Sequence, residues 1–198
     1  MCRGGKFWAR FLVIALAVLV VSSALLVRQI HLPSAQPSED MLQAGDIIFV
    51  DLYKGWCATT YWDHAAIYVG DQDIEGGQSS AGVVEATYSG GVVRTPLWAF
   101  LERDDPAKMA VRRLRDVPSR EEDIQKAIDY ALAQVGKPFD FTATATIPWK
   151  VNEANLHCTE LIWRAYKAAG IDLDFDDGLL LYPDDIYYSS KLRPVGES

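Results

Sequence analysis

Three residues of the types that form a catalytic triad are spread along the chain: Cys158, His64 and Glu85. Cys158 lies in "HCTELIWRAYKAAG", residues 157–170, at the first turn of a predicted helix, where free backbone N–H groups stabilise a nearby thiolate. A buried structural cysteine is the alternative, because Cys158 shares a helical stripe with apolar residues and buried free thiols are common. The spacing alone leaves both interpretations open.

A cysteine nucleophile needs a base, and the chain has three histidines. His31 lies in a predicted linker. The side chain of His157 diverges from that of Cys158 by about 100°, because a helical turn takes 3.6 residues. His64 opens a predicted strand after an aromatic loop and is the better candidate base, while His157 is a candidate for lining the site or stabilising an oxyanion. A packing or surface role for His64 is the alternative.

A catalytic imidazole needs a partner that fixes its tautomer. Glu85, in "VVEAT", is a carboxylate in a run of otherwise apolar or small residues. If it is buried it must be hydrogen-bonded, because an unpaired buried charge is costly. An outward-facing position on a half-exposed strand is the alternative.

The sequence lacks the common motifs for binding a metal or a cofactor. No CxxC, HExxH, P-loop or GxGxxG pattern is present in the sequence. The acidic run "DLDFDDG", residues 172–178, lacks the Gly and Glu that a calcium loop places at its sixth and twelfth positions. We interpret it as a solvated acidic loop and predict no cofactor and no metal.

The elements around the candidate residues predict an α+β domain. Antiparallel strands are expected at 45–52, at 64–71, as two strands within 82–95 around a Gly turn, and at 108–115. Amphipathic helices are expected at 119–136, opened by a capping box from Ser119, and at 155–170, capped by Asn155, with a short helical tail at 183–192. Two principal helices should therefore pack on an antiparallel sheet.

The N-terminus predicts a membrane anchor. Three basic residues precede an uncharged apolar run, residues 11–27, which is just long enough to span a bilayer. We expect residues 1–30 to be an uncleaved signal anchor, residues 31–40 a linker, and residues 41–198 a single domain outside the cytoplasm, periplasmic or otherwise extracytoplasmic. Residues 41–198 contain 15 basic and 25 acidic residues, a net charge of −10, so nucleic acid is an unfavourable partner.

Five segments together resemble a known family: "AGDIIF", "DHAAIYVG", "VVEAT", "ALAQVGKPFDF" and "HCTELIWRAYKAAG". In this order, from Gly45 to Leu192, they resemble the permuted NlpC-type, papain-like cysteine hydrolases of the YiiX kind. The resemblance implies a papain-like antiparallel sheet or small barrel with helices packed on it, and an order in which the histidine and acid strands precede the cysteine helix.

Carried over by position, the resemblance makes His64 the base, Glu85 the orienting acid and Cys158 the nucleophile. Phe139 and Asp140 match the aromatic-plus-acid segment before the cysteine helix, with Phe139 where a tyrosine is common. His157 is not expected from the family, and its role stays open.

The implied activity is cleavage of an amide bond through an acyl-enzyme, with cell-envelope peptides or peptidoglycan fragments as the expected substrates. Tyr61 and Trp62 are further candidates for substrate contacts, within an aromatic cleft with Trp56 and Trp149. The alternatives are a thioesterase or acyltransferase acting on lipid amides or esters, and a binding module that kept the fold without activity.

Overall fold

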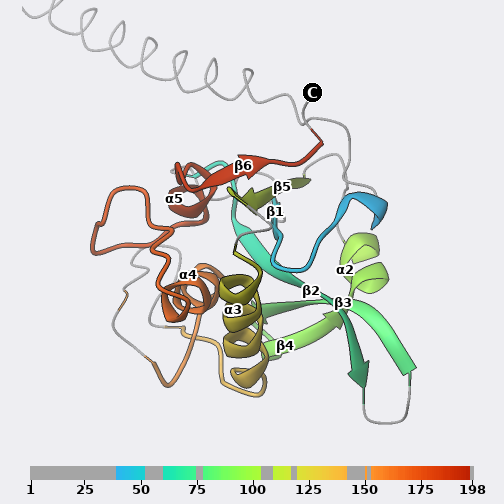
Figure 1. Ribbon diagram of the computed structural model, residues 1–198. Helices are drawn as coiled ribbons and strands as arrows, with labels where there is room; N and C mark the ends of the chain where they lie inside the picture. Colours follow the sequence, from blue (N-terminus) through green and yellow to red (C-terminus); the bar gives the residue numbers. More distant parts are fainter. Residues whose placement is uncertain are drawn as a thin grey trace, which may run out of the picture. The chain divides into compact units, whose positions relative to one another are not determined.

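The computed structural model describes residues 39–51, 60–74, 78–103, 109–116, 120–141, 150 and 153–196. The elements run in the order η1 (Glu39–Met41), β1 (Ile47–Val50), β2 (His64–Ile74), β3 (Gln78–Thr87), β4 (Gly91–Pro96), α2 (Leu97–Arg103), β5 (Met109–Leu114), α3 (Glu121–Ala133), α4 (Cys158–Ala168), α5 (Pro183–Tyr187) and β6 (Leu192–Pro194) (Figure 1).

The six strands form one antiparallel sheet in the order β4-β3-β2-β1-β5-β6. All four residues of β1 are buried. This explains why β1 is a continuous apolar run and does not alternate, because a strand covered on both faces has no solvent side. Strand β1 pairs with β2 on one side and with β5 on the other, so it joins the β2–β3–β4 part of the sheet to β5 and β6.

Two apolar clusters cover the two faces of the sheet. Side chains alternate along a strand, so Ala65 and Ile67 of β2 pack with the buried residues of α3 and α4. Ala66 and Tyr68 pack on the other face, with Phe100 of α2. Figure 1 shows α3 and α4 next to each other and α2 apart from them. The sheet is therefore held between a two-helix layer and one short helix.

The two main helices follow the predicted stripes. The buried side of α3 consists of Ile124, Ala127, Ile128 and Ala131. Gly45, which precedes β1 with φ +90°, lies so close to α3 that a Cβ there would be 2.5 Å from Cγ2 of Ile124. The hydroxyl of Tyr166, on α4, donates to the Gly45 carbonyl. The turn before β1 thus fixes both helices against the sheet, and only glycine fits there.

The α+β class, the antiparallel sheet and the two principal helices are confirmed, but several details of the prediction are wrong. Helix α2 and strand β6 were not predicted: β6 has only three residues, and the periodic signal of the seven-residue α2 covers a single helical turn. The predicted tail helix ends at Tyr187, since residues 192–194 pair with β5. Arg120 takes the N-cap position of α3, with no side-chain cap bond, in place of Ser119.

The N-cap of α4 is also different from the prediction. His157, not Asn155, is the N-cap, with extended backbone and a ring nitrogen that accepts the Glu160 N–H. An N-cap needs only a side-chain acceptor at that position, and an imidazole nitrogen provides one. The helix therefore starts at Cys158 itself.

None of the helices within the described ranges combines the length and apolar character needed to cross a bilayer. The predicted anchor, residues 1–30, lies outside those ranges, as do Cys57, Trp56, Trp149 and His31.

Candidate active site

Cys158 is the first residue of α4 and is 9% exposed. Its thiol is free, and Sγ lies 3.8 Å from Oγ1 of Thr159. At the first position of a helix, the backbone N–H of Cys158 belongs to the turn whose N–H groups have no partner within the helix. The sequence folds this way because His157 caps the helix from the preceding position.

His64 is the first residue of β2, so its ring lies at the end of the strand, and it is 6% exposed. Its Nε2 lies 2.7 Å from Oε2 of Glu85 on the neighbouring strand β3. The other ring nitrogen, Nδ1, is left for Cys158, with which the imidazole also interacts. The structure thus brings together all three residues that the sequence proposed as a triad.

Glu85 is fully buried and receives donors from three elements. His64 contacts Oε2 from β2, and the hydroxyl of Thr95 on β4 donates to Oε1 at 2.6 Å. Arg103 of α2 binds both carboxylate oxygens, with Nη1 3.0 Å from Oε1 and Nη2 2.9 Å from Oε2. Burial alone would raise the pKa of Glu85, but these donors lower it to about 2. The carboxylate is ionised at neutral pH.

The charges of His64 and Cys158 are coupled. Burial would lower the pKa of His64, but its interactions with Cys158 and Glu85 raise that pKa to about 10. Burial would likewise raise the pKa of Cys158, but the adjacent imidazoles of His157 and His64 hold it well below its usual range. At neutral pH the site therefore favours a thiolate beside an imidazolium, which is the reactive form of a cysteine.

His157 takes a different position from His64. Its Nδ1 lies 3.4 Å from the Glu160 N–H nitrogen, as a helix cap. Its Nε2 is 3.9 Å from Oε2 of Glu160, and both of these buried atoms have no hydrogen-bond partner in the described part of the chain. His157 lies beside the thiol but is oriented by the helix backbone, not by a carboxylate.

Phe139 and Asp140 lie alongside the chain that leads into Cys158. Phe139 forms a parallel bridge with Leu156, and the Asp140 N–H donates to the Leu156 carbonyl at 3.2 Å. Both side chains are buried, at 7% and 1% exposure. The predicted aromatic-plus-acid segment is therefore next to the cysteine, while its contact with substrate stays a prediction.

Tyr61 and Trp62 lie in the segment that leads into β2 and His64. Their backbone N–H groups donate to the carboxylate of Asp184 in α5, at 2.8 and 2.9 Å. Trp62 is 2% exposed and packs against Phe49 and Tyr187. Trp62 is thus a core residue, and Tyr61 is half-buried beside it. A substrate contact for either residue stays a prediction.

Sequence reasoning missed three residues that support the site: Arg103, Thr95 and Asp184. No local motif marks them, because each acts on a residue distant in the chain. The spacing of Leu97, Phe100 and Leu101 was the one available signal, since apolar residues three and four apart predict a helix that would carry Arg103.

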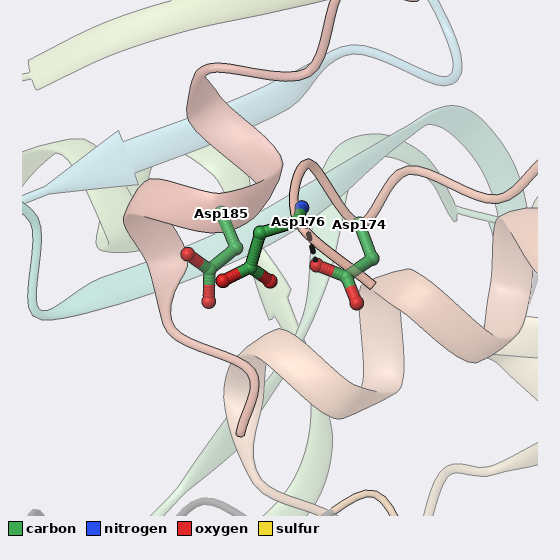
Figure 2. A group of neighbouring side chains, drawn as sticks. All are labelled: Asp174, Asp176 and Asp185. Carbon is green, nitrogen blue, oxygen red and sulfur yellow. Dashed lines mark hydrogen bonds between the residues drawn. The ribbon is translucent and has the colours of Figure 1, made fainter. Parts of the chain in front are cut away.

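A group of three aspartates lies elsewhere, two in the loop that follows α4 and one, Asp185, in α5. Figure 2 shows Asp174, Asp176 and Asp185 turned toward one another, and one oxygen from each lies within 4.8 Å of the others. Asp174 is not solvated as expected: its side chain is 1% exposed and pairs with Lys150. Burial and the neighbouring aspartates raise the pKa of Asp185.

These three carboxylates do not form a complete metal site. Calcium takes six to eight oxygen ligands, and here one of the three carboxylates already binds an ammonium group. No hydrogen bond or ion pair within the described ranges joins these aspartates to Cys158, His64 or Glu85, so no chemistry at the thiol is assigned to them.

The fold and the candidate site together define a class. A sheet that carries a histidine and an acid, with a helix that begins at a cysteine packed against it, is the arrangement of papain-like cysteine hydrolases. Residues 41–179 match the family described as "Permuted papain-like amidase enzyme, YaeF/YiiX, C92 family". The chain belongs to this family.

Two known proteins are similar to the chain. The uncharacterized protein YycO of Bacillus subtilis (strain 168) is 30% identical over 160 residues, covering 76% of this chain and 54% of that protein. The chain thus spans about half the length of this curated relative. The crystal structure of the metalloprotein yiiX from Escherichia coli O157:H7 has the same fold, with a TM-score of 0.62 and 22% identity over 80% of this chain and 98% of that one.

Proposed function

We propose that the chain is a cysteine hydrolase that cleaves an amide bond through a covalent acyl-enzyme, with Cys158 as nucleophile, His64 as base and Glu85 as its orienting acid. The observation that supports this best is the bond of His64 Nε2 to Glu85, which leaves Nδ1 for the thiol at the start of α4. Membership of an amidase family supports the same chemistry.

In the first half of the reaction, the Cys158 thiolate attacks the carbonyl carbon of the substrate, and a C–S bond forms. The developing oxyanion is stabilised by the backbone N–H of Cys158, which is free at the helix start. The tetrahedral intermediate collapses as the C–N bond breaks, and the His64 imidazolium gives its proton to the leaving amine. The products of this step are a thioester and a neutral imidazole.

In the second half, water attacks the thioester and gives a proton to His64. The C–S bond breaks, the acid leaves, and the thiolate and imidazolium are restored. Throughout both halves, Glu85 holds the ring by Nε2 and stabilises its charged form. No step requires a metal or a cofactor.

The substrates that we propose are peptides of the cell envelope. The apolar run at residues 11–27 supports a single membrane anchor with the domain on the extracytoplasmic side. A linker of about ten residues extends at most about 36 Å, so the site would remain close to the bilayer. The same observation favours the second candidate, a thioesterase or acyltransferase that acts on lipid esters or amides.

Thiol reactivity tests the proposal directly. We would alkylate the full-length protein in detergent with iodoacetamide across pH 4 to 10 and follow the Cys158 peptide by mass spectrometry, because the chain also contains Cys2 and Cys57. We expect rapid alkylation below pH 7, slowed strongly by His64→Ala. A thiol that reacts only after unfolding would show that Cys158 is a core residue.

Substrate class requires a second assay. Purified protein and its Cys158→Ala variant would be incubated with peptidoglycan peptides and, separately, with lipid esters and amides. New amines from peptides, absent with the variant, support the amidase. Cleavage of lipids alone supports the second candidate.

A further inference from the structure

Among the described residues, the Arg103 guanidinium is the only charged group besides His64 that donates to the Glu85 carboxylate. It forms two parallel hydrogen bonds, one to each oxygen. Such a forked pair fixes the plane of a carboxylate as well as its charge. Because His64 shares Oε2 with Arg103, the orientation that Arg103 imposes also sets the direction in which Glu85 accepts from His64.

The burial of Glu85 makes this donor important. The carboxylate is fully buried, and an ionised carboxylate in that position is stable only when it is paired. Thr95 supplies a neutral donor, and His64 supplies a positive charge only while it is protonated. Arg103 is the donor whose charge does not depend on pH. It therefore compensates Glu85 at every stage of a reaction in which His64 gains and loses a proton.

Helix α2 brings this guanidinium to the site. Leu97 and Phe100 anchor the helix in the apolar cluster on its face of the sheet. The Phe100 ring lies 6.3 Å from the His64 ring, and the Arg103 guanidinium lies 5.0 Å from the centre of the Phe100 ring. The helix thus contacts both members of the His64–Glu85 pair, one through each of two side chains.

We propose that Arg103 is a positioning residue of the active site, which holds the Glu85 carboxylate in the orientation and charge that His64 requires. This inference rests on the proposed function and extends it, because it makes α2 part of the catalytic arrangement. Arg103 does not touch the substrate or the thiol in this assignment; it acts through Glu85 and His64.

The inference predicts the direction of a change in pH dependence. The groups that face Glu85 are His64 from β2, Thr95 from β4 and Arg103 from α2, and Cys158 of α4 faces His64. Loss of the guanidinium raises the pKa of Glu85, so the carboxylate takes up a proton at higher pH. The imidazolium then loses its partner, and the pKa of the Cys158 thiol rises as well. Thiol reactivity falls on the acid side of its pH profile as the thiolate takes up a proton, and we call this part of the profile the acid limb. Both changes move the acid limb to higher pH.

The experiment compares full-length Arg103→Gln and Arg103→Lys with the wild type. The alkylation rate of the Cys158 peptide would be measured from pH 4 to 10. We expect Arg103→Gln to move the acid limb upward by about one pH unit, which is about tenfold in rate on that limb because one pKa unit is a tenfold change in the thiolate fraction. Arg103→Lys retains the charge without the two parallel hydrogen bonds, so its acid limb should lie closer to that of the wild type than to that of Arg103→Gln.

The chain offers a matched control in Arg113. This arginine also forms a pair of hydrogen bonds to a buried carboxylate, with its Nε and Nη2 each 2.7 Å from an oxygen of Asp46. It lies on β5, and its hydrogen-bond partners within the described ranges are Asp46 and the Met41 carbonyl, not residues of the Cys158 site. Arg113→Gln therefore removes a comparable pair without changing the proposed machinery. We expect its acid limb to match the wild type.

The outcomes separate the inference from the proposed function. An unshifted acid limb in Arg103→Gln, or an equal shift in Arg113→Gln, overturns the role of Arg103 even if His64→Ala slows alkylation. A wild-type thiol that is inert in the folded protein overturns the proposed function itself. If Arg103→Gln does not fold, Thr95→Val removes the other Oε1 donor and should shift the limb in the same direction by a smaller amount; no shift there would count against the inference.

Discussion

Two buried histidine–glutamate pairs lie beside Cys158 and behave differently. In the first, Nε2 of His64 is 2.7 Å from Oε2 of Glu85. In the second, Nε2 of His157 is 3.9 Å from Oε2 of Glu160. Both glutamates have fully buried side chains, so burial does not distinguish the pairs. The difference lies in the donors that surround each carboxylate.

Glu85 has donors on both oxygens, and its pKa is lowered to about 2. Glu160 is contacted by Arg164 through Oε1, while Oε2 has no hydrogen-bond partner within the described ranges. Burial therefore dominates at Glu160 and raises its pKa. Donors, rather than depth, decide whether a buried carboxylate is a stable anion.

The comparison bears on which histidine is the base. A catalytic imidazole needs a stable anion behind it to hold its tautomer and stabilise its charged form. Glu85 meets this requirement for His64, whereas His157 uses its Nδ1 as a helix cap and faces a carboxylate at a distance too long for a hydrogen bond. The histidine next to the cysteine in sequence is thus the less suitable of the two.

The largest expected effect separates the two histidines. We expect His64→Ala to lower amide hydrolysis about a thousandfold, because general acid–base catalysis contributes about 10²–10⁴-fold. His157→Ala should lower it by about tenfold or less, since it removes a helix cap and one of two imidazoles beside the thiol. Steady-state rates on the same peptide measure both variants, and equal losses would show that the pairs are not functionally distinct.

The second effect separates the two glutamates. Glu85→Gln should destabilise the fold by about 3 kcal/mol, because the lowered pKa corresponds to about 1.4 kcal/mol per unit and Arg103 would lose its anion. Glu160→Gln keeps an acceptor for Arg164 and removes a poorly compensated charge, so its free energy of unfolding should change by less than about 1 kcal/mol. Urea unfolding at pH 7 compares them, and a larger loss for Glu160→Gln would contradict the comparison.

The residues of the site differ in how far they could be predicted from the sequence. Local pattern placed Cys158 at a helix start, His64 at a strand start and Glu85 in an apolar strand, because periodicity and short motifs record which element a residue occupies. Pattern alone left a structural role open for each, and the family resemblance assigned them to a triad. Arg103 could not be assigned, since its partner is eighteen positions away on a strand whose neighbours are set by the folded sheet.

His157 illustrates a different limit. Helical geometry argued against it as the base, but the cap was assigned to Asn155, because asparagine is among the preferred cap residues and histidine is not. The structure places an imidazole nitrogen at the same position instead. Propensity ranks side chains by frequency, whereas in the structure the helix begins two residues after Leu156, which pairs with Phe139 in a parallel bridge.

A smaller effect follows from the pH dependence of stability. The pKa of Glu85 is lowered in the fold, so its stabilisation is present above its ordinary value of 4.5 and is lost as the pH falls toward 2. The pKa of Glu160 is raised, so its charged form costs stability above the ordinary value, and acid relieves that cost. The deficit of Glu85→Gln relative to wild type should therefore shrink between pH 5 and about pH 3.

Over the same range, the stability that Glu160→Gln gains by removing this charge should also disappear. Alkaline pH acts through His64, whose pKa is raised to about 10, so its contribution is fully present below its ordinary 6.5 and is lost as the pH rises through 10. Denaturant unfolding at several pH values measures each variant. A Glu85→Gln deficit that stays constant down to pH 3 would mean that Glu85 is not held as an anion.

The smallest effect concerns the third group of carboxylates, Asp174, Asp176 and Asp185. Like the charge of Glu160, the negative charge of this group is only partly balanced, because Lys150 contacts one of its three carboxylates. A bound divalent ion would supply the missing positive charge and stabilise the fold by mass action, by about 2.7 kcal/mol at a hundred times its Kd. Three carboxylates with one already paired form an incomplete shell, so we expect millimolar Ca²⁺ to move the thermal midpoint by less than about 1 °C.

Asp176→Asn is the matched variant for this test, because it removes one charge from the group without touching the pair with Lys150. It should raise the midpoint slightly by relieving repulsion, and it should do so equally with Ca²⁺ and with EDTA. A calcium-dependent rise in the wild type that is absent in Asp176→Asn would instead identify the group as a cation site. In that case the positive charge of a bound ion, rather than side-chain donors, would do for these aspartates what Arg103 and Thr95 do for Glu85.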